Sequence, residues 1–253
     1  MKSAEINIKN GNITVRLARN AEEVEQAQKL RYEILILNYD DSKDKQGLDA
    51  CEHDKYCECL VAIDETTGKV VGTYRLMSNK HLEQIDSFIC ENEYDLSSLK
   101  NCGSNVLELG RAVVHQDYRN GVVIRMLWQG LFQYCKQCNI KYMFGLIGFV
   151  GTDAEKHKNT LSYLKRNYLV DEKLDCNAKE PCVKYALLDK DQIDEYEAKK
   201  AIPSLLKGYL ALGCKVASGS YIDYDFNSTD ILIILDVDNI NKTFAKRMFG
   251  VEL

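Results

Sequence analysis

Hydrophobic and polar positions follow two different periods along the chain. Alternation with a period of two indicates a strand, and apolar spacing of three and four indicates a helix. Ile13, Val15 and Leu17 alternate with polar residues, which predicts a strand. Val122 to Cys138 is apolar on nearly every face, which predicts a helix buried in the core. In chain order the pattern predicts strands at 12–18, 59–64, 70–77, 106–114, 141–150, 183–188 and 221–237, and helices at 20–38, 122–138, 153–169, 191–202, 204–212 and from 241 onward.

This order of elements predicts a fold class. Strand, helix, strand hairpin, strand, helix, strand and helix is typical of the α/β acetyltransferase-like (GNAT-like) fold. We therefore expect a central mixed, twisted sheet flanked by helices and splayed between its fourth and fifth strands to seat an acyl thioester, with a C-terminal helix/strand extension. Neither a linker nor an internal repeat interrupts the pattern, so a single domain over 1–253 is expected.

Composition and charge narrow the function classes. The chain has 253 residues, of which 45% are hydrophobic, enough for a sizeable core. Its 33 Lys and Arg against 38 Asp and Glu give a net charge of −5, which disfavours a nucleic-acid partner. No signal peptide and no apolar run long enough to span a bilayer is evident. We expect a soluble, cytoplasmic protein that approaches the inner membrane surface at most peripherally.

Ten scattered cysteines raise the question of a metal site. Cys135 and Cys138 form a CxxC, and Cys57 and Cys59 lie upstream. A structural zinc site needs four converging ligands, and Cys135 and Cys138 lie within a predicted buried helix rather than on a turn. Reduced thiols and no metal are the expectation.

Two charged residues interrupt the apolar strand at 106–114. Glu108 and Arg111 are costly to bury there, and strand alternation would place them on opposite faces. A bulge at Gly110 would bring both onto one face and turn a backbone N–H outward as an oxyanion donor. One interpretation is a structural ion pair that ties the sheet together. The other is a general base beside a positioning arginine.

The loop between this strand and the next helix bears on the acyl donor. In this position acetyltransferases usually carry a glycine-rich turn whose N–H groups hold the pyrophosphate of coenzyme A. Here Gly121 is followed by Val122 and Val123, so the further small residues are missing. The pattern favours a donor with a single phosphopantetheine, carried on a protein.

Matching segments along nearly the whole chain carry a family resemblance. The chain resembles the acyl-carrier-protein-dependent N-acyltransferases: ornithine N-acyltransferases, often labelled hemolysin-like, and long-chain N-acyl amino acid synthases. More distantly it resembles acyl-homoserine-lactone synthases. The segments are Val15-Arg-Leu-Ala18, Leu30-Arg-Tyr32, Asp54-Lys-Tyr-Cys-Glu-Cys-Leu-Val61, Val71-Gly-Thr-Tyr-Arg-Leu76, Glu93-Tyr-Asp-Leu96, Glu108-Leu-Gly-Arg111, His115-Gln-Asp-Tyr-Arg119, Leu127-Trp-Gln-Gly-Leu131, Gly151-Thr-Asp153, Leu161-Ser-Tyr-Leu164, Leu206-Lys-Gly-Tyr-Leu210 and Asp225-Phe-Asn-Ser-Thr-Asp230.

The resemblance implies roles for particular residues. Glu108 would be the catalytic glutamate, with Arg111 beside it, and Arg31, Asp54 and Arg75 would complete a charged, substrate-binding cluster. The acceptor ammonium must lose a proton before it attacks, and a carboxylate can take that proton directly or through a water. Asp54 would hold the ammonium, and an arginine would grip an acceptor carboxylate. Alternatively, the arginines only pin Glu108 and Asp54.

The donor is expected to be an acyl-phosphopantetheine on acyl carrier protein, with no cofactor bound permanently. A carrier protein is typically acidic, so a local basic patch at Arg119, Arg125, Lys156, Lys158, Lys165 and Arg166 would attract it, unless these residues form only a solvated face. An aromatic stripe is more often plain core than an acyl slot. The acyl and pantetheine chain is expected along Ala112, Val113, Val114, Arg119, Gly121, Trp128 and Phe149.

The expected reaction is transfer of a long acyl chain to the primary amine of an amino acid or small amino alcohol, giving an N-acyl amide lipid. The amine stays open among ornithine, lysine, glycine, glutamine and serinol-like acceptors. Cys59 departs from the ornithine-type enzymes, which more usually have a histidine there. Rival hypotheses are a coenzyme A-dependent N-acetyltransferase, an acyl-homoserine-lactone-type synthase using adenosylmethionine, and a lipid-binding, haemolysin-like protein without catalysis.

Overall fold

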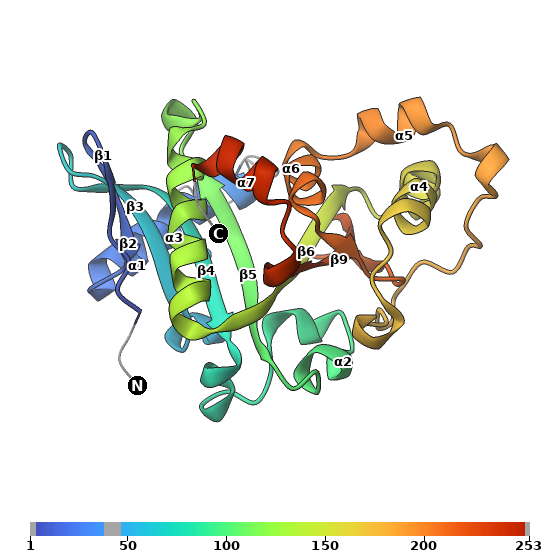
Figure 1. Ribbon diagram of the computed structural model, residues 1–253, viewed down its shortest axis with the longest axis horizontal. Helices are drawn as coiled ribbons and strands as arrows, with labels where there is room; N and C mark the ends of the chain where they lie inside the picture. Colours follow the sequence, from blue (N-terminus) through green and yellow to red (C-terminus); the bar gives the residue numbers. More distant parts are fainter. Residues whose placement is uncertain (1–3, 38–46, 251–253) are drawn as a thin grey trace. The chain divides into compact units, whose positions relative to one another are not determined.

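A computed structural model describes residues 4–37 and 47–250 (Figure 1). The chain divides into two compact units. The first lies within Met1–Asp86, Leu109–Ile140 and Lys242–Leu253, and the second within Ser87–Glu108 and Lys141–Asn241. Both contain strands and helices, so the predicted α/β class is confirmed. The single domain and the splayed sheet stay predictions.

The first unit is a layer of strands with helices on both faces. The strands lie in the order β1-β2-β3-β4-β5, and the β1–β2, β2–β3 and β3–β4 pairs are antiparallel. Strand β5 begins within the second unit and continues into the first. The elements are β1 (Ile8–Asn10), β2 (Ile13–Leu17), α1 (Ala21–Tyr32), β3 (Glu58–Asp64), β4 (Lys69–Ser78), β5 (Asn105–Val114), α3 (Val122–Cys138) and α7 (Lys242–Phe249).

Alternation along β3 explains how two helices cover this layer. Val61 packs with Ala27 and Leu30 of α1 in one buried cluster. The neighbouring Leu60 points the other way, since a Cβ on Gly130 of α3 would lie 3.3 Å from its methyl groups. Helix α3 crosses this second face, as Figure 1 shows. Successive side chains of this strand therefore pack against two different helices, one on each face of the sheet.

Helix starts follow the expected capping chemistry. The Oδ1 of Asn20 accepts a hydrogen bond from the backbone N–H of Glu23 at 2.9 Å, which caps α1. Gly121 takes a left-handed conformation (φ 88°) directly before α3, and the side chain of Asn120 accepts the N–H of Val122. These local signals explain why both helices begin where the sequence predicts.

The second unit is built around the antiparallel pair β6 and β9. Strand β7 pairs with the other edge of β9, and β8 pairs with β9 as well. Phe88 and Phe144 meet edge to face in its core, with ring centres 5.1 Å apart. The elements are α2 (Ser97–Lys100), β6 (Ile140–Val150), α4 (Lys158–Tyr168), α5 (Glu195–Ala201), α6 (Ser204–Leu212), β7 (Lys215–Val216), β8 (Tyr221–Asp223) and β9 (Ser228–Asp236).

Several predicted elements differ from the structure. The predicted strand at 183–188 is wrong: Leu188 N–H bonds the Oγ of Ser162 and Tyr185 OH bonds the carbonyl of Ala154, so this segment packs irregularly against α4 and its surroundings. The helix predicted over 20–38 ends as α-helix at Tyr32 and continues as a π-turn to Leu37, while residue 38 lies outside the described residues. The predicted loop at 39–56 lies partly outside them too, and its end forms a 3-10 turn. The short strands β1 and β7 were not predicted.

The helices of the described ranges differ in length and apolar character. Across residues 4–37 and 47–250, none is both long enough and apolar enough to cross a bilayer.

Candidate active site

The first unit contains a cluster of buried opposite charges, with Arg31 at its centre. Arg31 is 2% exposed. Its Nε donates to Asp49 Oδ2 at 2.9 Å, and its Nη1 and Nη2 donate to the two oxygens of Asp54 at 3.0 and 3.1 Å. Nη2 also donates to the backbone carbonyl of Asp49. Each of the three guanidinium nitrogens therefore already has a partner.

Asp54 is held as an anion by this arrangement. Burial opposes ionisation, but the hydrogen bonds and charge of Arg31 outweigh it and keep the pKa of Asp54 below its ordinary value. Its Oδ2 also accepts the backbone N–H of Cys51 at 2.8 Å. The same pairing raises the pKa of Arg31 despite its burial. Both oxygens of Asp54 are thus committed to protein donors, although the sequence assigned Asp54 to a substrate ammonium.

Arg75 on β4 is bound much less completely. It is 4% exposed, its Nη1 donates to Cys51 Sγ at 3.2 Å and lies 3.6 Å from Asp54 Oδ1. Its buried Nε has no hydrogen-bond partner among residues 4–37 and 47–250. Nε and Nη2 face Gly110, where a Cβ would lie 3.7 and 3.5 Å from them. The Nε/Nη2 side of this guanidinium is therefore turned to a position without a side chain.

Arg111 on β5 has an unusual backbone. Its φ is 53°, in the left-handed region that side chains other than glycine rarely adopt. The sequence predicted an irregularity at Gly110, and the structure has the positive φ one residue later. The Nε of Arg111 donates to Asp49 Oδ2 at 2.8 Å. Strain kept inside a strand points to a functional position.

Glu108 belongs to the second unit and is 3% exposed. Its carboxylate accepts the backbone N–H groups of Ile89 at 2.8 Å and Cys90 at 3.1 Å, and the Cys90 thiol at 3.1 Å. These three hydrogen bonds fix the orientation of the carboxylate. Glu108 is therefore a fixed, buried carboxylate.

The residues expected along the acyl and pantetheine chain have varied surroundings. Val113 packs in the cluster that faces α1, while Ala112 and Val114 are half-buried. Arg119 donates from Nε to the carbonyl of Val114 at 3.0 Å. The role of these positions toward a donor stays a prediction.

The two aromatic candidates both lie in packed surroundings. Trp128 is 2% exposed and stacks on Phe249 at 5.1 Å, with Phe132 beside it at 5.4 Å. In the second unit, Phe149 is 4% exposed and meets His157 at 5.4 Å. Aromatic rings packed in this way are what a plain hydrophobic core requires. Their assignment to an acyl slot stays a prediction.

The predicted basic patch needs a correction at Lys165. Its side chain is buried, and desolvation lowers its pKa to about 8, so it does not belong to a solvated surface. Arg166 pairs with Asp189 at 3.4 Å, and Lys158 with Glu155 at 3.3 Å. Lys156 pairs with Asp153 at 3.4 Å, so three of the predicted surface cations are already paired with carboxylates.

Two cavities lie beside α4, and Glu108 lines neither of them. The smaller, of about 250 Å³, is lined by Tyr163 and Tyr168 among others. The larger has a volume of about 460 Å³ and is lined by Tyr163, Lys165, Arg166, Asn167, Leu187, Lys190, Ile193 and Glu195.

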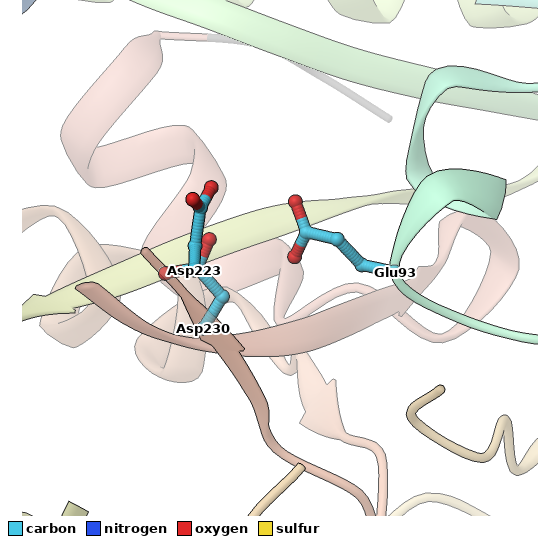
Figure 2. Close-up of side chains that lie close together, drawn as sticks. All are labelled: Glu93, Asp223 and Asp230. Carbon is cyan, nitrogen blue, oxygen red and sulfur yellow. The ribbon is translucent and has the colours of Figure 1, made fainter. Parts of the chain in front are cut away.

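A group of three carboxylates in the second unit was not predicted as a site. Glu93 follows the turn that holds Glu108, Asp223 ends β8, and Asp230 lies on β9. Figure 2 shows Glu93 facing the two aspartates, and one oxygen from each lies within 4.8 Å of the others. Burial and the charges of Asp230 and Asp223 raise the pKa of Glu93 to about 8. Such a group can share a proton or accept a hard cation such as Ca²⁺ or Mg²⁺.

Two further residues of the first-unit cluster were missed by sequence reasoning. Asp49 and Cys51 lie in a polar segment without periodicity, so the pattern gives no reason to single them out. The signal that was present is chemical: three arginines of the expected cluster need more acceptors than Asp54 alone offers.

All ten cysteines are free thiols in the structure.

Comparison with known proteins gives the chain its relatives. The profile described as Acetyltransferase (GNAT) domain matches residues 30–129, which confirms the predicted fold class. L-ornithine N(alpha)-acyltransferase of Rhodobacter capsulatus is 34% identical over 237 residues, covering 90% of this chain and 91% of its own. The enzyme of the same name from Brucella abortus is 33% identical over 256 residues, covering 96% and 90%.

A solved structure resembles the chain more weakly. FeeM, an N-acyl amino acid synthase from uncultured soil microbes, overlaps with a TM-score of 0.46 at 9% identity, covering 90% of this chain and 92% of its own. A likeness of this strength supports no conclusion about the reaction.

Proposed function

The chain belongs to the family of the L-ornithine N(alpha)-acyltransferases, and from that premise we propose that it transfers a long acyl chain from acyl carrier protein to the amine of an amino acid or small amino alcohol. That it is an N-acyltransferase follows from its relatives. The donor, the acceptor and the catalytic residues are the proposal. The product would be an N-acyl amide lipid, which would bring the enzyme into peripheral contact with the inner membrane surface.

The observation that carries the proposal is the buried carboxylate of Glu108, fixed by two backbone N–H groups. A carboxylate held in a fixed orientation can take a proton from an incoming ammonium, directly or through a water. We assign this general-base role to Glu108. Within the cluster formed by Arg31, Asp54 and Arg75 in the first unit, Arg75 would bind the acceptor. Arg31 and Asp54, which were expected to bind it as well, would hold Arg75 in place, with Arg111 as a further positioning residue.

The reaction then balances without a covalent enzyme intermediate. The ammonium loses one proton to Glu108, and the amine nitrogen attacks the thioester carbonyl carbon. A tetrahedral oxyanion forms, for which backbone N–H groups near Gly110 to Ala112 are the proposed donors. The C–S bond breaks as the C–N bond becomes an amide. The nitrogen gives up its second proton in this step, and the phosphopantetheine thiolate leaves as a thiol by taking up one proton. The proton held by Glu108 passes to solvent, so the base is ready for the next turnover.

The loop before α3 supports acyl carrier protein as the donor. Coenzyme A requires a cradle for its pyrophosphate, and the chain offers Gly121 followed by the branched Val122 and Val123. A phosphopantetheine on a carrier protein has one phosphate and needs less of such a cradle. The residues proposed to contact the acyl and pantetheine chain are Ala112, Val113, Val114, Arg119, Gly121, Trp128 and Phe149.

The test combines three donors with one acceptor. Purified protein is incubated with ornithine and palmitoyl-acyl carrier protein, palmitoyl-coenzyme A or acetyl-coenzyme A, and the amide is measured by mass spectrometry. We expect product from the carrier protein alone, and a loss of at least about 100-fold in Glu108→Gln. Glu197→Gln, the same change on the exposed face of α5, should keep full activity. Equal activity of Glu108→Gln and wild type would remove the base assignment.

A further inference from the structure

Three arginines meet two carboxylates in the first-unit cluster. Asp49 pairs with Arg31 and Arg111, and Asp54 pairs with Arg31 and Arg75. Each aspartate is thus shared between two guanidinium groups. Buried charges are ordinarily paired, because an unpaired one is costly to desolvate. The three arginines outnumber the two aspartates, so a carboxylate supplied by a ligand would balance the charge of the cluster.

The hydrogen bonds show which arginine has capacity for that carboxylate. Every guanidinium nitrogen of Arg31 donates to Asp49 or Asp54. The Nε of Arg111 is taken by Asp49. Arg75 makes its polar contacts through Nη1, and its buried Nε has no partner in the described part of the chain. A buried N–H without an acceptor costs about 1–3 kcal/mol, so a ligand oxygen there would be favourable.

Gly110 lies opposite this side of Arg75 and has no side chain to cover it. Nε and Nη2 form the edge of a guanidinium that binds a carboxylate with two parallel hydrogen bonds. A Cβ at position 110 would lie 3.7 Å from Nε and 3.5 Å from Nη2, directly against that edge. Gly110 is not among the glycines with positive φ, so the absent side chain, and not an unusual backbone, is its distinguishing feature.

We propose that Arg75 binds the carboxylate of the acceptor through Nε and Nη2, beside Gly110, and that the enzyme therefore selects amino acids over amines and amino alcohols that lack a carboxylate. This inference rests on the proposed function and narrows its acceptor class. Arg75 is the specificity-determining group, and Gly110 keeps its binding edge open. Arg31 and Asp49 are positioning residues, which hold the rest of the cluster in place.

Binding is the first test, because it does not depend on turnover. Calorimetry compares ornithine with 1,4-diaminobutane, its analogue without the carboxylate. We expect wild type to bind ornithine at least tenfold more tightly than the diamine. Gly110→Ala and Arg75→Lys should remove that difference. Gly208→Ala on α6, where a Cβ meets nothing within 4 Å, should keep it.

The outcomes separate this inference from the proposed function. If wild type does not bind ornithine, or binds both compounds equally, or if Gly110→Ala keeps the preference while remaining folded by circular dichroism, the inference is wrong. Preferential binding of ornithine without amide formation from any thioester would leave the inference standing and overturn the proposed function. If the enzyme forms the amide with ornithine and with the diamine at equal kcat/KM, the inference is overturned and the proposed function stands. Gly110→Ala keeps the test decisive if Arg75→Lys does not fold.

Discussion

Asp49 and Arg111 are joined by a hydrogen bond of 2.8 Å from Nε to Oδ2, and the same oxygen accepts Nε of Arg31 at 2.9 Å. One carboxylate oxygen thus links α1 to β5. Two guanidinium groups that converge on one oxygen repel each other without its charge. Asp49 is therefore the residue on which the cohesion of the cluster depends.

Asp49→Asn should lower the free energy of unfolding by about 3 kcal/mol, because it removes one of the two carboxylates that neutralise the buried Arg31 and also the carboxylate that pairs with Arg111. Urea unfolding followed by tryptophan fluorescence measures this change. Asp191→Asn at an exposed position serves as the control and should change stability by less than about 0.5 kcal/mol. An Asp49→Asn protein as stable as wild type would show that the link contributes little.

The left-handed backbone of Arg111 can be tested by comparing two truncations. Arg111→Ala and Arg111→Gly both remove the bond to Asp49, but alanine keeps the strain of a φ near 53° and glycine does not. The glycine variant should be more stable than the alanine variant by about 1 kcal/mol. Thermal unfolding of the pair measures it. Equal stability, or a more stable alanine variant, would argue against a strained residue here.

Gly72 of β4 should tolerate no side chain, since a Cβ there would lie 2.7 Å from Cγ1 of Val123 on α3. Gly72→Ala should destabilise the protein by about 1–3 kcal/mol through overpacking, because a β-branched side chain cannot move aside easily. The double variant with Val123→Ala should recover part of that loss in urea unfolding. Additive losses in the double variant would exclude the clash as the cause.

Glu93 should make stability depend on pH. Its pKa rises from 4.5 to about 8 on folding, because it is buried beside Asp230 and Asp223. Between these values the folded chain holds a proton that the unfolded chain has released. Stability therefore falls as the pH rises from 4.5 to 8, with a slope of up to about 1.4 kcal/mol per pH unit. Below that window the contribution of Glu93 is fully present.

Glu93→Gln should flatten this profile, because the amide stays neutral at every pH. Urea midpoints measured between about pH 5 and pH 9 should show that the stability of the variant rises relative to that of wild type as the pH rises. The exposed Glu83→Gln should leave the profile as it is in wild type. Parallel profiles for wild type and Glu93→Gln would mean that Glu93 titrates normally.

The sequence predicted the elements that carry a strong period or a clear cap. Helix α3 has the bounds expected from its apolar faces, and α6 ends at Gly213 with a φ of 112°. The strand predicted at 183–188 was wrong because an irregular segment that packs against its neighbours can have the same pattern of apolar positions as a strand. The π-turn after Tyr32 was not predicted, because the spacing of hydrophobic residues does not reveal a change in the period of the backbone hydrogen bonds.

The candidate site was predictable only where chemistry stood out from its surroundings. Glu108 and Arg111 interrupt an apolar strand, and the structure surrounds both with hydrogen-bonding partners. Arg31, Asp54 and Arg75 were expected together, and the structure brings them together in the first unit. Asp49 could not be found because its role comes from tertiary contacts across 18 and 62 positions of sequence. No local pattern encodes such contacts.

The saturation of Arg31 has a consequence for redesign of the enzyme. Its planar group spans two aspartates at once, so a lysine, with one nitrogen, would keep the charge and lose the geometry. Attempts to retune which nucleophile is accepted should therefore leave position 31 untouched and diversify positions 75 and 110.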